Sequence, residues 1–301
     1  MTTSAAHFAK GLVGLIWRLA VYFVILIGVT LLLAKGGSLA LHCAGVHFRH
    51  PPGVKSAEEV GLGEIFLLIA AGLSWRIMAR LDRSRPTHIL PARGAATAHA
   101  LQGLLWGLAS VGATVGAIAW LGGYNVSGLA LSGPMLAYYA TLWMGVAIIN
   151  GLSENLAVLG YPFLRTAAVV GWRPAILFVG LLFTAGRLAN AGENPLGLVS
   201  VFLVGVVLAT AIYLTGDLWL SVGLHAGAVF AEDFVFSVPD SGVVYTGHLL
   251  DSGFSGPAWL SGAAAGPEGS VVALPVFATV LALMWTVYRR RAPARVSSLQ
   301  A

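Results

Sequence analysis

Charged side chains are scarce in this sequence, and that scarcity excludes most soluble classes of protein. Only 10% of the 301 residues are Asp, Glu, Lys or Arg, whereas 57% are hydrophobic, and the mean hydropathy is +0.84. A soluble domain carries about a quarter charged residues, so this chain has too few of them to cover a water-exposed surface. The composition predicts an integral membrane protein and excludes a secreted, cytosolic or nucleic-acid-binding globule.

The sequence also has a single cysteine and no apparent internal repeat. Cys43 is the single cysteine, which excludes an internal disulfide, a CxxC redox pair and a cysteine-based metal site. No repeat of about 20 to 50 residues is apparent, and neither is the internal hydropathy symmetry that many transporters show. We therefore expect a single membrane domain covering residues 1–301.

Long apolar runs are what the sequence has instead. A helix needs about 20 apolar residues to cross the hydrocarbon core of a bilayer, and runs of this kind recur between polar or Gly- and Pro-rich breaks. The pattern predicts an all-α, polytopic membrane helix bundle with about eight transmembrane helices. The predicted spans are residues 12–34, 59–79, 95–121, 134–164, 173–190, 196–214, 217–237 and 270–288.

Basic residues concentrate in alternate loops, which indicates the orientation of the bundle. Cytoplasmic loops of membrane proteins carry an excess of Lys and Arg, and such an excess follows the second, fourth and last spans. The first outer loop is the exception, because it contains Lys35, Arg49 and Lys55. We expect a multi-pass protein of the cell membrane with both termini cytoplasmic. The basic residues behind this prediction are Arg80, Arg83, Arg85, Arg93, Arg165, Arg173, Arg289, Arg290, Arg291 and Arg295.

The stretch 237–269, between the last two spans, has a different composition from the rest of the chain. It is rich in Gly, Ser, Pro and Ala, and it contains Asp240, Asp251 and Glu268 but no Lys or Arg. We expect an extracytoplasmic loop. Between the two interpretations of a lid and a flexible connector, we favour the connector.

The third predicted span contains two small-xxx-small pairs. Gly103 with Gly107 and Gly112 with Gly116 are each four residues apart, a spacing that lets helix backbones approach closely. We expect these pairs to serve packing within the chain rather than a dimer interface.

A few ionisable residues lie inside the predicted spans, where they are costly unless they have partners or a function. At about 1.5 Å of rise per residue, Glu154, Arg187 and His225 fall near one level in the middle of the bilayer, on three different helices. For Glu64 and His99 we expect a neutral, hydrogen-bonded carboxyl and a satisfied core histidine. The remaining polar residues of the mid-membrane group are Asn155, Asn190, Glu232 and Asp233.

Three strings of sequence surround this group. They read SENLAVLGYPF at 153–163, FTAGRLANAGENP at 183–195 and TGDLWLSVGLHAGAVF at 215–230. In order and spacing they resemble the three motifs of the CPBP family of intramembrane endopeptidases, which includes the CAAX prenyl proteases and Abi-like proteins. The resemblance covers a CAAX-protease-like core at residues 134–236, about a third of the chain.

The motifs are degenerate at the positions where the family carries its chemistry. The resemblance implies two adjacent glutamates and an arginine in the first motif, a histidine in the second, and a histidine followed by Asn or Asp in the third. Glu154 and His225 retain the family side chains. The substituted positions are Asn155 for the second glutamate, Leu159 for the arginine, Arg187 for the second-motif histidine and Val229 for the Asn or Asp.

These substitutions change the chemistry that the resemblance implies, in which a glutamate assisted by histidines and an Asn activates water to attack a peptide bond. An arginine beside Glu154 would hold that carboxylate ionised and weaken it as a base. Arginine can neither shuttle a proton nor bind zinc. Catalytic zinc usually takes three protein ligands, so we expect neither a bound metal nor another cofactor. The purely structural alternative is a buried Glu154–Arg187 ion pair, with Asn155 and His225 satisfying the remaining hydrogen bonds.

Three functions stay open. The first is a catalytically impaired intramembrane endopeptidase, with Glu154 as base, Arg187 stabilising the oxyanion and His225 shuttling protons. The second is a non-catalytic pseudoprotease that binds a membrane protein or peptide in the same cavity, and the third is a small ion-coupled transporter. The expected partners are membrane lipids and a membrane-protein or prenylated-peptide substrate, but no nucleic acid.

Overall fold

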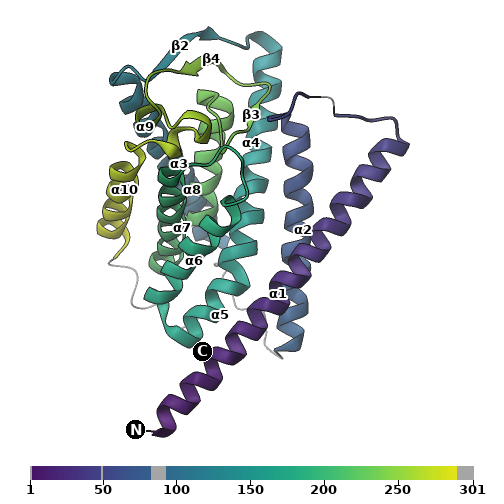
Figure 1. The fold of residues 1–301 in the computed structure, drawn as a ribbon, viewed down its shortest axis with the longest axis vertical. Coiled ribbons are helices and arrows are strands. Elements are labelled where there is room, and N and C mark those ends of the chain that lie inside the picture. The colour runs from purple at the N-terminus through teal and green to yellow at the C-terminus, as the bar shows by residue number, and fades with distance from the viewer. Residues whose placement is uncertain (1, 49, 83–92, 290–301) are drawn as a thin grey trace.

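Helices make up most of the structure, as the apolar runs predict. The computed structural model describes residues 2–48, 50–82 and 93–289, and most of its helices run side by side while α1 crosses them at an angle (Figure 1). The longer helices are α1 (Thr2–Cys43), α2 (Ala57–Leu81), α3 (Arg93–Trp120), α4 (Gly133–Asn155), α5 (Tyr161–Val170), α6 (Trp172–Arg187), α7 (Pro195–Thr215), α8 (Trp219–Val229) and α10 (Ala273–Tyr288).

Each predicted span coincides with one of these helices or with a run of consecutive ones. In the described part of the chain, five helical stretches are long and apolar enough to cross a membrane by themselves. Helix α10 is apolar but shorter, and α6 and α8 are also short. The prediction of an all-α, polytopic helix bundle is confirmed. The five stretches are Ala9–Cys43, Ala57–Leu81, Ala95–Trp120, Gly133–Val170 and Pro195–Thr215.

The turn between α7 and α8 explains the Thr-Gly-Asp-Leu-Trp string. Gly216 ends α7 in the left-handed conformation, with φ of 74°, which glycine adopts without steric cost. Asp217 then accepts the backbone N–H of Trp219 at 3.0 Å, near the start of α8. Its other oxygen lies 2.5 Å from Nδ1 of His99, and both side chains are buried. His99 is therefore a satisfied core histidine, as predicted.

Helices α3 and α8 pack backbone against backbone. A Cβ atom at Gly107 would lie 2.1 Å from the carbonyl oxygen of Leu224, and one at Gly103 would be equally crowded. Gly223 and Gly227, on the facing side of α8, would clash with α3 in the same way. The first small-xxx-small pair thus serves packing within the chain, as predicted, and it holds α8 at the level of His225.

The second predicted pair does not make such a contact. A Cβ at Gly112 would reach only van der Waals distance of Phe236, at 3.8 Å, and one at Gly116 would meet nothing within 4 Å. The spacing is the same as in the first pair, so the difference lies in what faces each glycine. Helix α8 ends at Val229 and does not run alongside Gly116.

Two π-helical turns interrupt the bundle close to the family motifs. The first, η1 (Leu156–Gly160), follows directly on Glu154 and Asn155 at the end of α4. The second, η2 (Phe230–Phe236), follows Val229 at the end of α8. Because π-turns widen a helix and are frequent at functional sites, they redirect the residues on each side of them.

The segment 237–269 is folded, so its interpretation as a flexible connector is wrong. It forms a layer over one end of the bundle (Figure 1), which we name the cap. Its strands pair with loops from the first half of the chain, β3 with β1 in parallel and β4 with β2 antiparallel. These long-range pairings are invisible in local composition. The cap contains β3 (Val244–Tyr245), β4 (Leu250–Phe254), α9 (Ala258–Ser261), η3 (Ala263–Ala265) and η4 (Pro267–Gly269), and its partner strands are β1 (Val54–Lys55) and β2 (Tyr124–Leu129).

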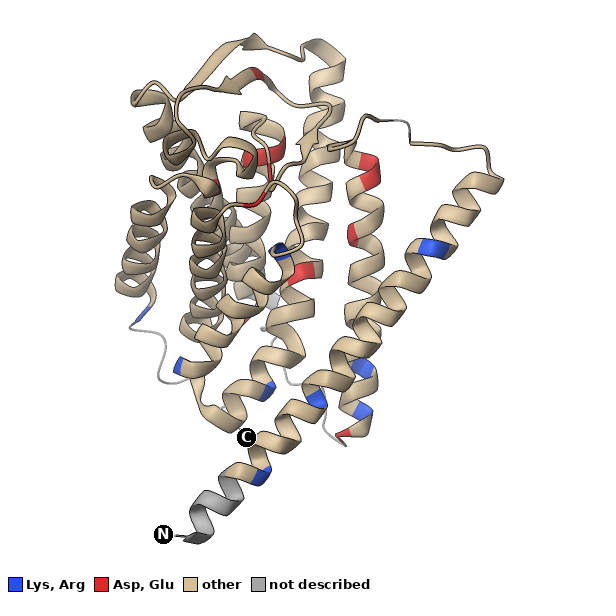
Figure 2. Cartoon of the chain, in the orientation of Figure 1, with Lys and Arg blue, Asp and Glu red and all other residues tan. Residues whose placement is uncertain are grey.

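Charges divide between the two ends of the bundle. Figure 2 shows most Lys and Arg at the end that carries the N-terminus, and most Asp and Glu toward the cap. This separation follows the alternation of basic loops along the sequence. Of the arginines that support the predicted orientation, Arg83, Arg85, Arg290, Arg291 and Arg295 lie outside the described residues.

Adding a methyl group at Gly107 should destabilise the bundle. Gly107→Ala places a Cβ against backbone of α8 that cannot move aside, and overpacking of this kind costs about 1–3 kcal/mol. We expect a lower melting temperature for the variant in detergent than for the wild type. Gly116→Ala, on the same helix but in open surroundings, is the control. Equal melting temperatures for both variants would contradict the close packing of α3 on α8.

Candidate active site

A cavity of about 600 Å³ lies between the bundle and the cap, and it brings together the side chains that the sequence placed at one level. Glu154 reaches it from the end of α4, Arg187 from the end of α6 and His225 from α8. The predicted convergence of these three residues therefore holds. Other polar groups on the cavity wall include Glu64, Asn150, Asn190, Asp233, Asp240 and Ser241.

Glu154 and His225 form the closest contact between the retained family residues. Oε2 of Glu154 lies 3.6 Å from Nε2 of His225, which is within electrostatic range but longer than a hydrogen bond. The Glu154 side chain is 29% exposed, whereas that of His225 is 8% exposed. The carboxylate can thus reach a molecule in the cavity while the imidazole is held in the protein interior.

Asn155 determines the form of His225. The amide is wholly buried, and its Nδ2 donates to the carbonyl of Gly151 at 2.6 Å and lies 3.1 Å from Nδ1 of His225. A carbonyl only accepts hydrogen bonds, so the amide atom beside Gly151 is the nitrogen, and its second hydrogen goes to His225. Nδ1 is then an acceptor, and the neutral ring carries its hydrogen on Nε2, facing Glu154.

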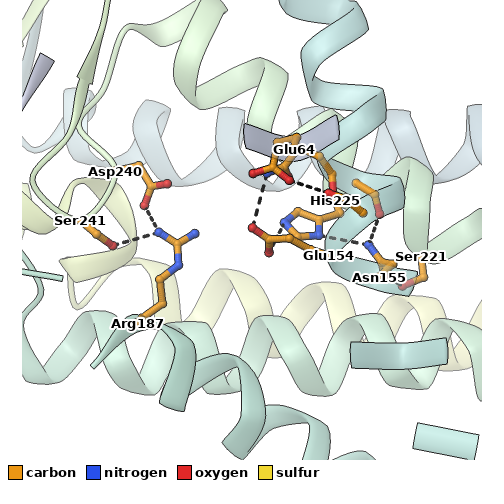
Figure 3. Close-up of polar contacts among 11 residues, drawn as sticks. Glu64, Glu154, Asn155, Arg187, Ser221, His225, Asp240 and Ser241 are labelled. Carbon is orange, nitrogen blue, oxygen red and sulfur yellow. Dashed lines mark hydrogen bonds and ion pairs between the residues drawn. The ribbon is translucent and has the colours of Figure 1, made fainter. Parts of the chain in front are cut away.

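Ser221 holds the same amide from its other side. Its hydroxyl donates to Oδ1 of Asn155 at 2.6 Å (Figure 3). Ser221 lies one turn before His225 on α8, so the helical spacing places both side chains toward α4. Ser221 is not among the predicted site residues, although its spacing of four residues from His225 is visible in the third motif. With its hydrogen on Nε2, His225 is better suited to donate a hydrogen bond than to shuttle protons.

Arg187 pairs with the cap and not with Glu154. Its Nη1 donates to Oδ1 of Asp240 and, at 3.0 Å, to the hydroxyl of Ser241 (Figure 3). Ser241 in turn donates to Glu193 at 2.8 Å. The prediction of a Glu154–Arg187 ion pair is therefore wrong in its partner, because a cap expected to be flexible supplies a closer carboxylate.

The backbone supports this connection. Gly192, in the loop after α6, approaches the cap so closely that a Cβ there would lie 2.3 Å from Cα of Gly242. Gly242 has φ of 93°, a conformation that favours glycine. Contacts of side chain and backbone thus fasten the cap to the end of α6.

Val229 lies on the cavity wall, one helical turn after His225. The resemblance implies an Asn or Asp at this position. A valine side chain has no hydrogen-bonding atom, so it supplies no amide donor to the cavity. Val229 thus contributes no polar group to the cavity, whereas Asn155 bonds to Gly151, His225 and Ser221.

A second, smaller cavity of about 40 Å³ adjoins the first. Glu232 and Glu268 line it, together with Glu154, Arg187 and Asp240. Burial raises the pKa of Glu268 to about 7, with Arg187 opposing the rise and the nearby carboxylates adding to it. Two acidic residues of the predicted mid-membrane group are divided between the cavities: Glu232 lines this smaller one, and Asp233 lines the first.

The donor set does not fit a metal ion. In residues 2–48, 50–82 and 93–289, no group of three or more His, Cys, Asp or Glu side chains is arranged to hold one. Nδ1 of His225 is engaged by Asn155, and its Nε2 carries a hydrogen, so neither ring nitrogen offers a lone pair in this form. Arg187 adds a fixed positive charge to the cavity wall.

Comparison with known families agrees with this geometry. Residues 136–231 match the family model described as type II CAAX prenyl endopeptidase Rce1-like. This segment, which we name the Rce1-like domain, is similar to that family. The match confirms the family resemblance, and it contains Glu154, Arg187 and His225 within about a third of the chain. In comparisons with curated proteins and with solved structures, no match reaches significance.

The cap and Glu64 lie outside the Rce1-like domain, although both contribute to its cavity. The helix-rich structure and the family match support a membrane-embedded protein of the CAAX-protease type. The arrangement of this site nevertheless depends on partners that the family segment does not contain.

The ion pair between Arg187 and Asp240 should hold the cap closed. Arg187→Ala and Asp240→Ala should each speed hydrogen exchange of the backbone amides in residues 237–269. Because they remove the same contact, the double variant should lose less stability than the sum of the two single variants, by about 0.5–3 kcal/mol. Asp251→Ala, at an exposed position of the same cap, is the control. Additive losses, or equal exchange in all variants, would refute the pairing.

Proposed function

We propose that this chain is a slow intramembrane endopeptidase, in which Glu154 activates a water molecule to hydrolyse a peptide bond. One observation carries the proposal: Glu154 and His225, which retain the family side chains, lie 3.6 Å apart on the wall of an accessible cavity. The carboxylate is the more exposed of the two, as a group that must reach water should be. The Rce1-like match supports the same reaction class.

In the proposed reaction, the ionised Glu154 removes a proton from water as the water oxygen attacks the peptide carbonyl carbon. Negative charge then develops on the carbonyl oxygen and needs hydrogen-bond donors. His225 supplies one through Nε2–H. Arg187 supplies another, because only its Nη1 bonds to Asp240 and Ser241 within the described residues, and Figure 3 shows its other terminal nitrogen directed toward Glu154.

The rate is limited by the same substitutions that make the site unusual. Arg187 cannot shuttle a proton, and it places a permanent positive charge on the wall of the cavity that Glu154 lines. Asp240 offsets part of this effect by pairing with Arg187. Val229 leaves the oxyanion without the side-chain amide that the family resemblance implies. We therefore expect turnover below that of relatives with the full set of polar residues.

A second candidate is a non-catalytic member of the family that binds a membrane peptide in the same cavity. Val229 and the closed cap favour it, because the first removes a polar group and the second restricts access. The substrate or ligand that we propose in either case is a segment of a membrane protein or a prenylated peptide, since the bundle itself is embedded in lipid.

Replacing Glu154 tests the first candidate. In detergent or liposomes, the wild type should cleave a transmembrane or prenylated peptide, and Glu154→Gln should lower kcat by at least about 100-fold because it cannot accept a proton. Glu58→Gln, at an exposed position, should leave cleavage unchanged. Comparison of one peptide with and without its prenyl group shows whether the lipid is recognised. Absent turnover in the wild type, or unchanged turnover in Glu154→Gln, would overturn the hydrolase, and peptide binding retained in both would favour the second candidate.

We also propose that the basic end of the bundle faces the cytoplasm and that the cap lies on the outer side of the cell membrane. The charge separation supports this orientation (Figure 2). The cavity reaches Gly53, Lys55 and Gly242 at the cap end, so peptide would approach it from the outer side or from within the bilayer.

The single native cysteine reports this orientation directly. Cys43 is exposed at the end of α1, away from the N-terminus. A membrane-impermeant maleimide should label Cys43 in intact cells. In Cys43→Ser combined with Arg80→Cys, which moves the thiol to the opposite, exposed end of α2, labelling should require permeabilised cells. The reverse pattern would place the cap in the cytoplasm.

A further inference from the structure

Glu64 belongs to the cavity although it comes from outside the family segment. It lies in α2, more than 70 residues before the Rce1-like domain begins at residue 136, and it lines the same cavity as Glu154. Its Oε2 lies 2.5 Å from the hydroxyl oxygen of Ser153, the residue that precedes Glu154. A carboxyl from a fourth helix is thus joined to the motif that carries the base.

The bonds of Ser153 indicate that Glu64 carries a proton. The Ser153 hydroxyl also lies 3.0 Å from the backbone carbonyl of Asn150, a group that only accepts. One hydroxyl has one hydrogen and cannot donate to both oxygens. Both contacts are hydrogen bonds at once only when Ser153 donates to Asn150 and Glu64 donates its own proton to Ser153.

The surroundings favour the same state. Two carboxyl groups that line one cavity do not both ionise readily, because each negative charge disfavours the other. Glu154 faces the Nε2–H of His225 and the guanidinium of Arg187, whereas Glu64 is bonded to the hydroxyl of Ser153 (Figure 3). Glu64 is then the member that keeps its proton. The charged and titratable groups that line this cavity with Glu64 are Lys55, Glu59, Glu154, Arg187, His225, Asp233, Asp240 and Tyr245.

We infer that Glu64 is the second carboxyl of the active site and acts as its general acid. This inference rests on the proposed hydrolysis. Asn155, at the family's second glutamate position, has no acidic proton to give, and its amide is committed to Gly151, His225 and Ser221. The group that supplies the proton therefore comes from another helix.

The reaction balances with these two carboxyls. Glu154 takes one proton from water, and the water oxygen forms a bond to the carbonyl carbon. The C–N bond then breaks, and the leaving amine nitrogen takes the proton of Glu64. The products are a carboxyl and an amine, and the site is left with Glu154 protonated and Glu64 ionised. Transfer of the proton from Glu154 back to Glu64 through solvent in the cavity restores the starting state.

Infrared spectroscopy tests the proton on Glu64 without requiring turnover. In the purified, full-length protein, Glu64→Gln should remove an absorption band of a protonated carboxyl that persists at neutral pH. Glu154→Gln should shift the titration of that band to lower pH, because Glu64 loses the neighbouring negative charge that disfavours its ionisation. Glu59→Gln, on the same helix and the same cavity, should leave the band in place. A band unchanged in Glu64→Gln, or one removed by Asp233→Asn instead, overturns the inference.

Kinetics tests the catalytic role. If the wild type cleaves peptide, Glu64→Gln should lower kcat about 100-fold at similar KM and abolish the fall in rate at high pH that comes from loss of an essential acid. Glu58→Gln, at an exposed position of the same helix outside the cavity, should keep both the rate and the pH profile. A Glu64→Gln variant with wild-type kcat refutes the general acid. If the wild type itself is inert, the proposed hydrolysis fails, and the infrared result still decides whether Glu64 and Glu154 form a coupled pair.

Discussion

The hydrogen bond from Asn155 to His225 governs the chemistry available to this cavity. Asn155 is held by the Gly151 carbonyl and by Ser221, so its orientation cannot change without leaving a buried polar group unpaired. That orientation makes Nδ1 of His225 an acceptor and directs the hydrogen on Nε2 toward Glu154. A single buried amide thereby turns an imidazole that could bind a metal or shuttle protons into a hydrogen-bond donor.

Arg187, at the position where the resemblance implies a histidine, affects more of the structure than its own surroundings. An unpaired guanidinium in an apolar bundle is costly. Asp240 and Ser241 of the cap pair with Arg187, and Gly192 packs closely on Gly242 beside them. The cap is fastened over the cavity as a result. The same cation lines the cavity that Glu154 and Glu64 share. Side chains of α2 and of the cap thus contact the segments whose motifs depart from the family pattern.

Much of the fold could be predicted from local sequence. The apolar runs locate the helices because a bilayer leaves a backbone few alternatives to helical hydrogen bonding, and Gly103 and Gly107 indicated a close helix contact. The cap could not be predicted, since β3 and β4 pair with β1 and β2 from distant parts of the chain. For the same reason the partner of Arg187 was wrongly assigned: helix rise gives the depth of a side chain but not which loop folds over it.

The sequence by itself determined that the protein is a helical membrane bundle with an Rce1-like segment, and that Glu154, Arg187 and His225 approach one level within it. Hydropathy, helix rise and short motifs are local properties, so they can be evaluated without knowing which segments pack against them. Only the tertiary structure decided that Asn155 orients His225, that Asp240 engages Arg187 and that Glu64 joins Glu154. Those contacts join residues between 53 and about 90 positions apart. Hydrogen bonds depend on distances of tenths of an ångström and on direction, which only the packing of the helices and the cap establishes.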